Sequence, residues 1–393
     1  MIYKNLISLI YLVIGAFSLL LASNAHSAIR VDCSDLPEEE QRMCEGTGNP
    51  PPPPPVECPE GLYPQKNGSC KPYLAQVKLL TYNTWLLDTD VPGLAASHRE
   101  LRAKMLGKVL KNSDYDIIAL QETFDDSAAD LIFKATRFSH PYRIKQLPED
   151  PSALKMDGGL SFISKHKLLF EWSFPWKTCS STDCYANKGF VYTKVNAGNG
   201  VFINLINAHL NADGSQLEDL IFSFKKTRKE QLHQLKSFVL ERNEVNIMKL
   251  FIYMGDFNID GPISNSAHMG DEYNTLKQIL GVGIRDAWLE SGVNYSSSCG
   301  YEFGYTHMGK ELSVSPSCPS NYFTSDSNVR LDYILVDDTS INHQKYRVEI
   351  KNTKVFRPEL EVDLDFGHFT IPKSMDLSDH FGVSSVITVY PKN

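Results

Sequence analysis

Polar side chains that could bind a metal ion recur at the ends of apolar, strand-like stretches of this sequence. Asp256 and Asn258 follow one such stretch, and a spacing of two puts both side chains on one face of an extended chain. His209 and Asn211 repeat that spacing after another stretch. The remaining candidates in comparable positions are Asn83, Glu122, Asp332, Asp379 and His380. Each alone has an ordinary interpretation as a turn residue, a cap or a buried histidine, but together they indicate one site.

The residue types in this set predict hydrolysis at a hard metal ion. Carboxylate and amide oxygens without thiolates suit Mg²⁺, with Ca²⁺ or Mn²⁺ as alternatives. Such an ion can polarise a phosphoryl oxygen. A histidine held by a carboxylate can accept a proton from water, and a second histidine with an asparagine can hydrogen-bond oxygens that gain negative charge. No serine or cysteine lies in a recognisable nucleophile elbow, which favours direct attack by water.

The elements that must position these residues alternate between strands and helices from Gln76 onward. Strands are predicted over residues 77–83, 116–120, 158–164, 191–195, 201–206, 250–254, 330–336 and 383–389. The fourth and fifth are expected to pair antiparallel. Capping boxes at 97–100 and 215–218 predict the starts of two helices. This mixture favours an α/β sandwich of sheets flanked by helices over a doubly wound parallel sheet.

The second of these helices is predicted to have an apolar face and a charged face. The apolar positions are Leu217, Ile221, Phe224, Leu232, Leu235 and Val239. The charged run is Lys225, Lys226, Arg228, Lys229 and Glu230. We interpret this run as a solvated helix face in preference to a binding patch.

The N-terminal part of the chain has the features of an export signal and a linker. Residues 1–28 are predicted to be a cleaved signal peptide, with an uncleaved membrane anchor as the alternative. Residues 29–75 form a leader with four cysteines and six consecutive prolines, which favour an extended spacer. Residues 76–393 are assigned to one catalytic domain. We therefore expect a secreted protein, extracellular or periplasmic.

Composition and cysteine usage agree with an exported globular protein. Hydrophobic residues make up 42% and charged residues 22% of the 393 residues. Removing Lys4 with the signal peptide would change the net charge from -8 to -9, which disfavours an ordinary nucleic-acid binder. All eight cysteines can pair, and nearest neighbours would join 33 with 44, 58 with 70, 179 with 184 and 299 with 318. On the order of 100 other pairings stay open.

Taken in order, the motifs that carry the candidate residues resemble those of the endonuclease/exonuclease/phosphatase superfamily, which has the DNase I fold. They are Asn83, Gln121-Glu122, His209-Leu210-Asn211, Gly255-Asp256-Phe257-Asn258, Arg330-Leu331-Asp332-Tyr333 and Ser378-Asp379-His380. The resemblance covers roughly residues 76 to 390. It implies a four-layered sandwich of two mixed β-sheets flanked by helices.

The same resemblance implies a role for each candidate residue. Glu122 would be the principal metal ligand, supported by Asn83 and Asp379, and His380 would be the general base, oriented by Asp332. The residues that would position water or phosphate are Asp256, Asn258 and His209. The further substrate contacts it suggests are Asn211 and Lys188.

Within the superfamily, the chain looks most similar to neutral and secreted bacterial sphingomyelinases, which cleave sphingomyelin to ceramide and phosphocholine with Mg²⁺. The stretches that carry this similarity are residues 83–87, 121–125, 158–165 and 209–212. Residues 187–190 resemble both sphingomyelinases and inositol polyphosphate 5-phosphatases, so they do not distinguish between these two groups. Those phosphatases continue their Gly-Asp motif as Leu-Asn-Tyr-Arg, whereas this chain has Phe257-Asn258-Ile259-Asp260.

The similarity implies a phospholipid substrate and peripheral contact with membranes. A secreted nuclease and a non-catalytic lipid-binding module of the same fold are the alternatives. The aromatic segment 295–327 differs from the membrane-inserting hairpin of secreted sphingomyelinases. We expect it to be a disulfide-pinned surface loop in preference to a membrane contact.

Overall fold

The computed structural model describes residues 62–64, 70–87, 98–145, 156–214, 218, 221–241, 250–263, 270–291, 306–308, 328–361 and 374–392. The predicted signal peptide and most of the leader and of the segment 295–327 lie outside these ranges. Contacts divide the chain into two units, Met1–Glu60 with Pro64–Cys70, and Gly61–Tyr63 with Lys71–Asn393. Everything below concerns the second unit. Within the ranges given, no helix is long and apolar enough to span a bilayer.

Two six-stranded sheets form the centre of this unit. The β3 sheet has the strand order β15-β18-β3-β4-β6-β5 and the β10 sheet has the order β11-β14-β10-β9-β8-β7. The strands of the β3 sheet are β3 (Ala75–Asn83), β4 (Ile117–Gln121), β5 (Tyr142–Ile144), β6 (Ser161–Ser164), β15 (Tyr346–Phe356) and β18 (Gly382–Pro391). The strands of the β10 sheet are β7 (Trp172–Pro175), β8 (Gly189–Asn196), β9 (Phe202–His209), β10 (Leu250–Asp256), β11 (Arg285–Asp286) and β14 (Asp332–Asp337).

Both sheets are mixed. Strands β3 and β4 run parallel, as do β9 and β10, while the other pairs within the sheets are antiparallel. The antiparallel pair predicted for residues 191–206 is confirmed as β8 and β9. Short strands outside the two sheets are β1 (Leu62–Pro64), β2 (Cys70–Pro72), β12 (His307–Met308), β13 (Asn328–Val329), β16 (Glu359–Glu361) and β17 (Ser374–Asp376).

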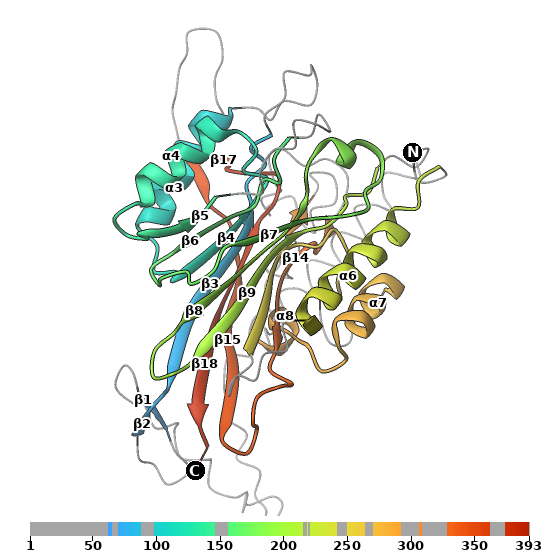
Figure 1. The fold of residues 1–393 in the computed structure, drawn as a ribbon. Helices are drawn as coiled ribbons and strands as arrows, with labels where there is room; N and C mark the ends of the chain where they lie inside the picture. Colours follow the sequence, from blue (N-terminus) through green and yellow to red (C-terminus); the bar gives the residue numbers. More distant parts are fainter. Residues whose placement is uncertain are drawn as a thin grey trace, which may run out of the picture. The chain divides into compact units, whose positions relative to one another are not determined.

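Helices cover the outer faces of the two sheets, which gives four layers (Figure 1). Helices α3 (Arg99–Lys111) and α4 (Asp126–Thr136) pack on the β3 sheet, and α6 (Phe224–Glu241) and α7 (Asp271–Leu280) pack on the β10 sheet. The shorter helices are η2 (Ser181–Tyr185) and α8 (Ala287–Glu290). The predicted sandwich is therefore confirmed.

The core lies in three apolar layers set by the alternation of side chains along each strand. Val77 and Leu79 of β3 and Ile252 and Met254 of β10 point between the sheets and are fully buried. Their neighbours along the strands point outward to the helices. Asn83 continues the inward series of β3 and Asp256 that of β10, so both strands deliver a polar group to the end of the same inter-sheet layer.

The helix start predicted at 97–100 is confirmed by α3, although the residue at the cap differs from the predicted one. Helix α3 begins after His98, which has a φ of 52° and caps no backbone group with its side chain. Glu218 of the second box is helical, but α6 itself begins only at Phe224, and residues 215–217 lie outside the described ranges. The Glu218 carboxylate accepts a hydrogen bond from the Ser181 hydroxyl. Ile221 lies outside α6 and is 72% exposed, contrary to its predicted place in the core.

The predicted solvated face of α6 is also wrong at Arg228. This side chain is buried, and its guanidinium donates to both carboxylate oxygens of Glu272 on α7, at 2.6 and 3.0 Å. It also donates to Asp213 at 2.7 Å. Arg228 therefore joins α6 to α7, while Phe224, Leu232, Leu235 and Val239 are buried as predicted.

Candidate functional site

Three neighbouring strands of the β10 sheet end in one row of polar residues. In the strand register, Asp256 of β10 lies opposite His209 of β9 on one side and Asp332 of β14 on the other. All three side chains are at most 2% exposed. The candidates from the β3 sheet are Asn83 at the end of β3, Glu122 after β4, and Asp379 and His380 before β18. The site therefore stands at the edge where both sheets end.

Asn83 links the two halves of the site. Its Nδ2 group donates to Glu122 Oε1 at 3.1 Å and to Asp256 Oδ2 at 3.0 Å. Its Oδ1 atom accepts from the backbone N–H of Trp85 at 3.1 Å. Asn83 thus holds two carboxylates from different sheets close to each other.

Close contact between β9 and β10 at the site requires the glycine at position 255. A Cβ atom there would lie 1.9 Å from the carbonyl oxygen of Ala208, and the residue has a φ of 140°. Any other residue would both clash and be strained at this φ. Gly255 is therefore the residue that allows Asp256 to stand beside His209.

His380 and Asp332 form a buried hydrogen-bonded pair. His380 Nδ1 lies 2.8 Å from Asp332 Oδ2, and His380 Nε2 lies 3.8 Å from Asp256 Oδ2. Burial alone would lower the pKa of His380, but the carboxylates of Asp332, Asp256 and Asp379 raise it well above the ordinary value. The bond to Asp332 leaves Nε2 as the nitrogen that faces the other carboxylates.

Glu122, His209 and Asp256 can each offer a ligand atom within 4.8 Å of the others. Burial and the nearby Asp379 raise the pKa of Glu122 to about 7, and burial raises the pKa of Asp256 to about 6. Burial lowers the pKa of His209, and neither of its ring nitrogens has a hydrogen-bond partner among the described residues. Buried carboxylates with raised pKa values fit a hard divalent cation, which favours their ionised form. A neutral histidine beside them can hydrogen-bond a water or phosphate oxygen.

Asn258 is held by a turn and not by strand alternation. Strand β10 ends at Asp256, and Asn258 has a φ of 51°. Its backbone N–H donates to Asp256 Oδ1 at 2.9 Å, and its Nδ2 group donates to the carbonyl of Leu210 at 3.0 Å. Phe257 between them is buried with its ring against Tyr333. Asp256 and Asn258 still line one cleft.

Asn211 and Lys188 lie beside the cluster around a small separate cavity. Lys188 Nζ donates to Asp183 at 2.9 Å, and Asn211 Oδ1 accepts from the backbone N–H of Ser180 at 2.8 Å. Both partners belong to the loop closed by the disulfide between Cys179 and Cys184. This disulfide agrees with one of the nearest-neighbour pairs. Cys70 is also disulfide-bonded, and the other five cysteines lie outside the described ranges.

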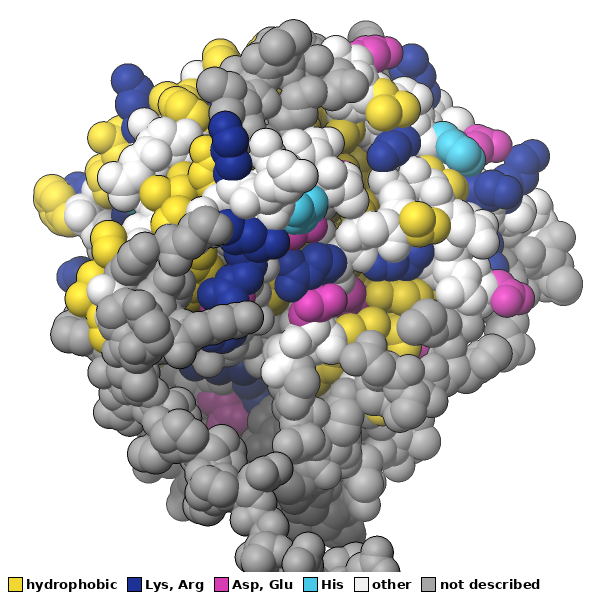
Figure 2. Space-filling view, turned by 90° about the horizontal axis from the view of Figure 1, so that it is seen from below, with side chains coloured by type: hydrophobic (Ala, Val, Ile, Leu, Met, Phe, Trp, Pro, Cys, Tyr) yellow, Lys and Arg dark blue, Asp and Glu magenta, His cyan; other side chains and the backbone are white. Residues whose placement is uncertain are grey.

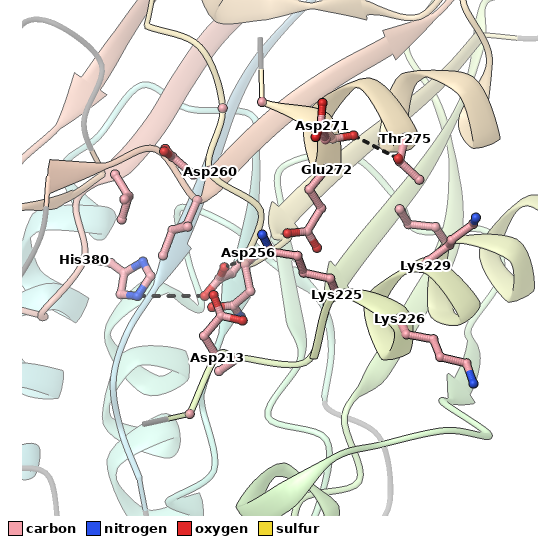
Figure 3. A pocket seen from close by; sticks show the side chains of 18 of the residues that line it. Asp213, Lys225, Lys226, Lys229, Asp256, Asp260, Asp271, Glu272, Thr275 and His380 are labelled. Carbon is pink, nitrogen blue, oxygen red and sulfur yellow. Dashed lines mark hydrogen bonds and ion pairs between the residues drawn. The ribbon is translucent and has the colours of Figure 1, made fainter. Parts of the chain in front are cut away.

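A cleft of about 1360 Å³ opens over the cluster. Its acidic end is lined by Glu122, Asp256, Asn258, Asp379 and His380. The cleft continues between the start of α6 and the start of α7, where its lining includes Lys225, Lys226, Lys229, Asp271 and Glu272. Figure 3 shows Lys225 extending toward the acidic side chains, while Lys226 and Lys229 extend away from them.

Arg102 is a supporting residue that the sequence analysis missed. Its buried guanidinium donates to the carbonyls of Thr84 at 2.9 Å, Trp85 at 2.6 Å and Leu377 at 2.8 Å. It thereby ties the loop after Asn83 to the loop before Asp379. The sequence could have identified Arg102 by its position, because it lies four residues before the core residue Leu106 on α3, where a charged side chain is unusual.

Comparison with known proteins agrees with this geometry. The profile of the Endonuclease/Exonuclease/phosphatase family matches residues 80–380. A sphingomyelinase C of Bacillus cereus is 24% identical over 331 residues, which cover 80% of this chain and 89% of that protein. A phospholipase C of Staphylococcus aureus is 24% identical over 223 residues, which cover 54% of this chain and 66% of that protein.

Solved structures share the fold. A crystal structure of beta toxin from Staphylococcus aureus, described as a mutant with bound magnesium ions, aligns with a TM-score of 0.58 and 20% identity. The alignment covers 79% of this chain and 99% of the toxin.

Proposed function

Because this chain belongs to the Endonuclease/Exonuclease/phosphatase family, we propose that it is a metal-dependent phosphodiesterase that hydrolyses sphingomyelin, or a related phospholipid, to ceramide and phosphocholine. The observation that carries the proposal is the position of His380, bonded to Asp332 and adjacent to Asp256, in an open cleft that Glu122 also lines. This arrangement supplies a base and a cation site next to each other.

We assign a role to each residue of the cluster. Glu122, with Asn83, Asp379 and the neighbouring Asp256, would hold Mg²⁺ or a similar ion. When bound, the ion would polarise a phosphoryl oxygen of the substrate. His380 would accept a proton from the attacking water at Nε2, while Asp332 holds the proton on Nδ1. His209, Asn258 and Asp256 would orient the water and the phosphate, with Asn211 and Lys188 supporting them from the side.

We also propose that the protein acts outside the cytoplasm after residues 1–28 are removed. The Cys179–Cys184 disulfide supports this assignment, because such bonds persist in oxidising compartments. We would test this proposal by measuring the mass of the chain recovered from culture medium or periplasm. A chain that keeps residues 1–28 would contradict the proposal.

Phosphocholine release from vesicles is the direct test of the proposed activity. Sphingomyelin and phosphatidylcholine vesicles are incubated with the protein, with added Mg²⁺ or with EDTA, and duplex DNA is supplied in parallel. We expect release from sphingomyelin that requires the metal. Release that ignores EDTA would refute the metal mechanism, and cleavage of DNA without release from either lipid would assign the protein to the nucleases.

Loss of the Cys179–Cys184 disulfide is expected to lower phosphocholine release about tenfold. Asp183 in this loop holds both Lys188 and the backbone N–H of Ala212. A loop this short contributes stability on the order of 2 kcal/mol, so the fold should survive. The measurement compares the rates of the parent and the Cys179→Ser, Cys184→Ser double variant. Dithiothreitol should slow the parent at least as much as the double substitution does, and equal rates for parent and variant would contradict the prediction.

Replacing Arg102 with methionine is expected to weaken Mg²⁺ activation and to reduce release about a hundredfold. The change leaves three buried carbonyls without their donor, at roughly 1–3 kcal/mol each. Mg²⁺ titrations of the rate and urea unfolding check it. Arg102→Lys should restore part of the Mg²⁺ affinity, and Arg137→Met, which alters an exposed arginine, is the control. A loss of stability without a change in Mg²⁺ dependence would show that Arg102 has no positioning role.

A further inference from the structure

The start of α6 lines the cleft with basic side chains, and the segment directly before this helix exposes apolar ones. Ile221 is 72% exposed and Phe222 is 38% exposed, directly before the helix. Lys225, Lys226 and Lys229 follow on its first turns, are exposed, and line the cleft. We call these five residues the α6 rim.

The α6 rim is fixed in place by buried contacts beneath it. Arg228 joins α6 to Glu272 and Asp213, and it also donates to the carbonyl of Asn211 at 3.0 Å. The hydroxyl of Thr227 is hydrogen-bonded to that of Ser180. These contacts fix the first turns of α6, which carry Lys226 and Lys229, beside the cleft.

Lys226 and Lys229 of the α6 rim place exposed positive charge beside the cleft. On the face drawn in Figure 2, the basic side chains that gather near the centre have acidic side chains beside them. Among the described residues, Asp213 and Glu272 bond Arg228, and neither Lys226 nor Lys229 has an ion pair within 4.0 Å, although Glu230 lies on the same helix. These two lysines extend away from the acidic end of the cleft (Figure 3). A chain of net charge -8 therefore exposes two lysines without close ion pairs beside its cleft.

We propose that the α6 rim seats the cleft on the surface of an anionic bilayer. Ile221 and Phe222 would enter the interface, and Lys226 and Lys229 would contact the phosphates of acidic lipids. Exposed apolar side chains next to lysines are the composition that binds such surfaces. Because the two lysines point out of the cleft, they can contact the phosphates of a planar bilayer at its mouth. They are less well directed to contact a substrate bound inside the cleft. The inference rests on the proposed lipid substrate and adds the surface and the lipid charge that it recognises.

The test measures binding and not hydrolysis. The full chain, in EDTA, is mixed with sedimentable vesicles of phosphatidylcholine and sphingomyelin, or with vesicles in which about a fifth of the lipid is phosphatidylglycerol. We expect tighter binding to the anionic vesicles, with a difference that salt reduces. The Lys226→Gln, Lys229→Gln variant should lose roughly 30-fold in affinity for anionic vesicles only, taking roughly fivefold per lysine. Ile221→Ser should weaken binding to both kinds of vesicle.

The matched control is the Lys104→Gln, Lys108→Gln variant, which removes the same charge from exposed positions of α3. It should bind as the parent does. An equal loss in the control, no preference of the parent for anionic vesicles, or binding to DNA without binding to vesicles would each overturn the proposal. Because binding is measured without turnover, a result that refutes membrane binding by the α6 rim does not affect the proposed hydrolysis. A chain that binds the vesicles but releases no phosphocholine refutes only the hydrolysis.

Discussion

Replacing Glu122 with glutamine is expected to lower phosphocholine release at least about a thousandfold, because a metal ion contributes several kcal/mol to the stabilisation of charge in such reactions. Glutamine has nearly the size of glutamate but carries no charge, so it removes the proposed principal ligand with little change in packing. The rate at saturating Mg²⁺ gives the measurement. Glu171→Gln, at an exposed position, makes the same chemical change and should leave the rate unaltered.

The same substitution should stabilise the metal-free protein at alkaline pH. The pKa of Glu122 in the fold is about 7, against 4.5 for an ordinary glutamate. The folded state therefore binds the proton more tightly than the unfolded state does. Its contribution to stability is complete below pH 4.5 and is lost as the pH rises through 7. Glutamine cannot ionise, so the loss should be absent in the variant.

Urea unfolding of the parent and Glu122→Gln in EDTA at pH 5 and pH 8 measures this effect. We expect the variant to exceed the parent by roughly 3 kcal/mol at pH 8, since the pKa rises from 4.5 to about 7 and one pKa unit corresponds to about 1.4 kcal/mol. Mg²⁺ should then stabilise the parent more than the variant. A parent whose free energy of unfolding does not fall between the two pH values would show that Glu122 is not a strained acid in the metal-free fold.

Replacing Asp332 with asparagine is expected to lower release by roughly 10³-fold to 10⁴-fold, the cost of losing the carboxylate that orients a catalytic histidine. Asp332 is also the carboxylate that most raises the pKa of His380. A general base is active only when it is unprotonated, so the acid limb of the pH-rate profile marks its pKa. Asp332→Asn lowers that pKa, and the acid limb should move to lower pH.

Two further variants separate positioning from catalysis. His380→Asn should remove the acid limb and reduce the rate at least as much as Asp332→Asn, because the proton acceptor itself is lost. His343→Asn changes an exposed histidine and should retain the parent profile. If Asp332→Asn reduces the rate but leaves the acid limb of the pH-rate profile in place, Asp332 does not set the pKa of the general base.

The alternation of side chains along the strands accounts for most of what could be predicted about the site from the sequence. The inward series of β3 and β10 can be followed residue by residue to Asn83 and Asp256, and the structure places both at one edge. Side-chain alternation could not predict the turn after Asp256, where Asn258 leaves the extended conformation and donates to the carbonyl of Leu210, directly after β9. Such a contact depends on which strands are neighbours, and the sequence alone does not state that.

Helix starts and buried charges were less predictable for a related reason. Glu218 matches a capping pattern, yet its carboxylate has a partner in the disulfide loop, which is distant in sequence. Arg228 lies within a run of lysines, and only the approach of α7 with Glu272 buries it. In both cases a tertiary partner overrides the local preference of the residue.

Each sheet contributes about half of the site, and a further polar link joins the sheets below it. Gln121 at the end of β4 donates to Asn207 of β9 at 2.7 Å, and Asn207 donates to the carbonyls of Leu120 and Ser161 at 2.9 Å. A small slip of one sheet along the other would separate Asn83 from Asp256 while every strand stayed paired. We therefore expect the rate of phosphocholine release to depend on how the two sheets are aligned. A substitution such as Leu205→Ala, in the layer between the sheets, should cause heat inactivation at a lower temperature than the loss of secondary structure.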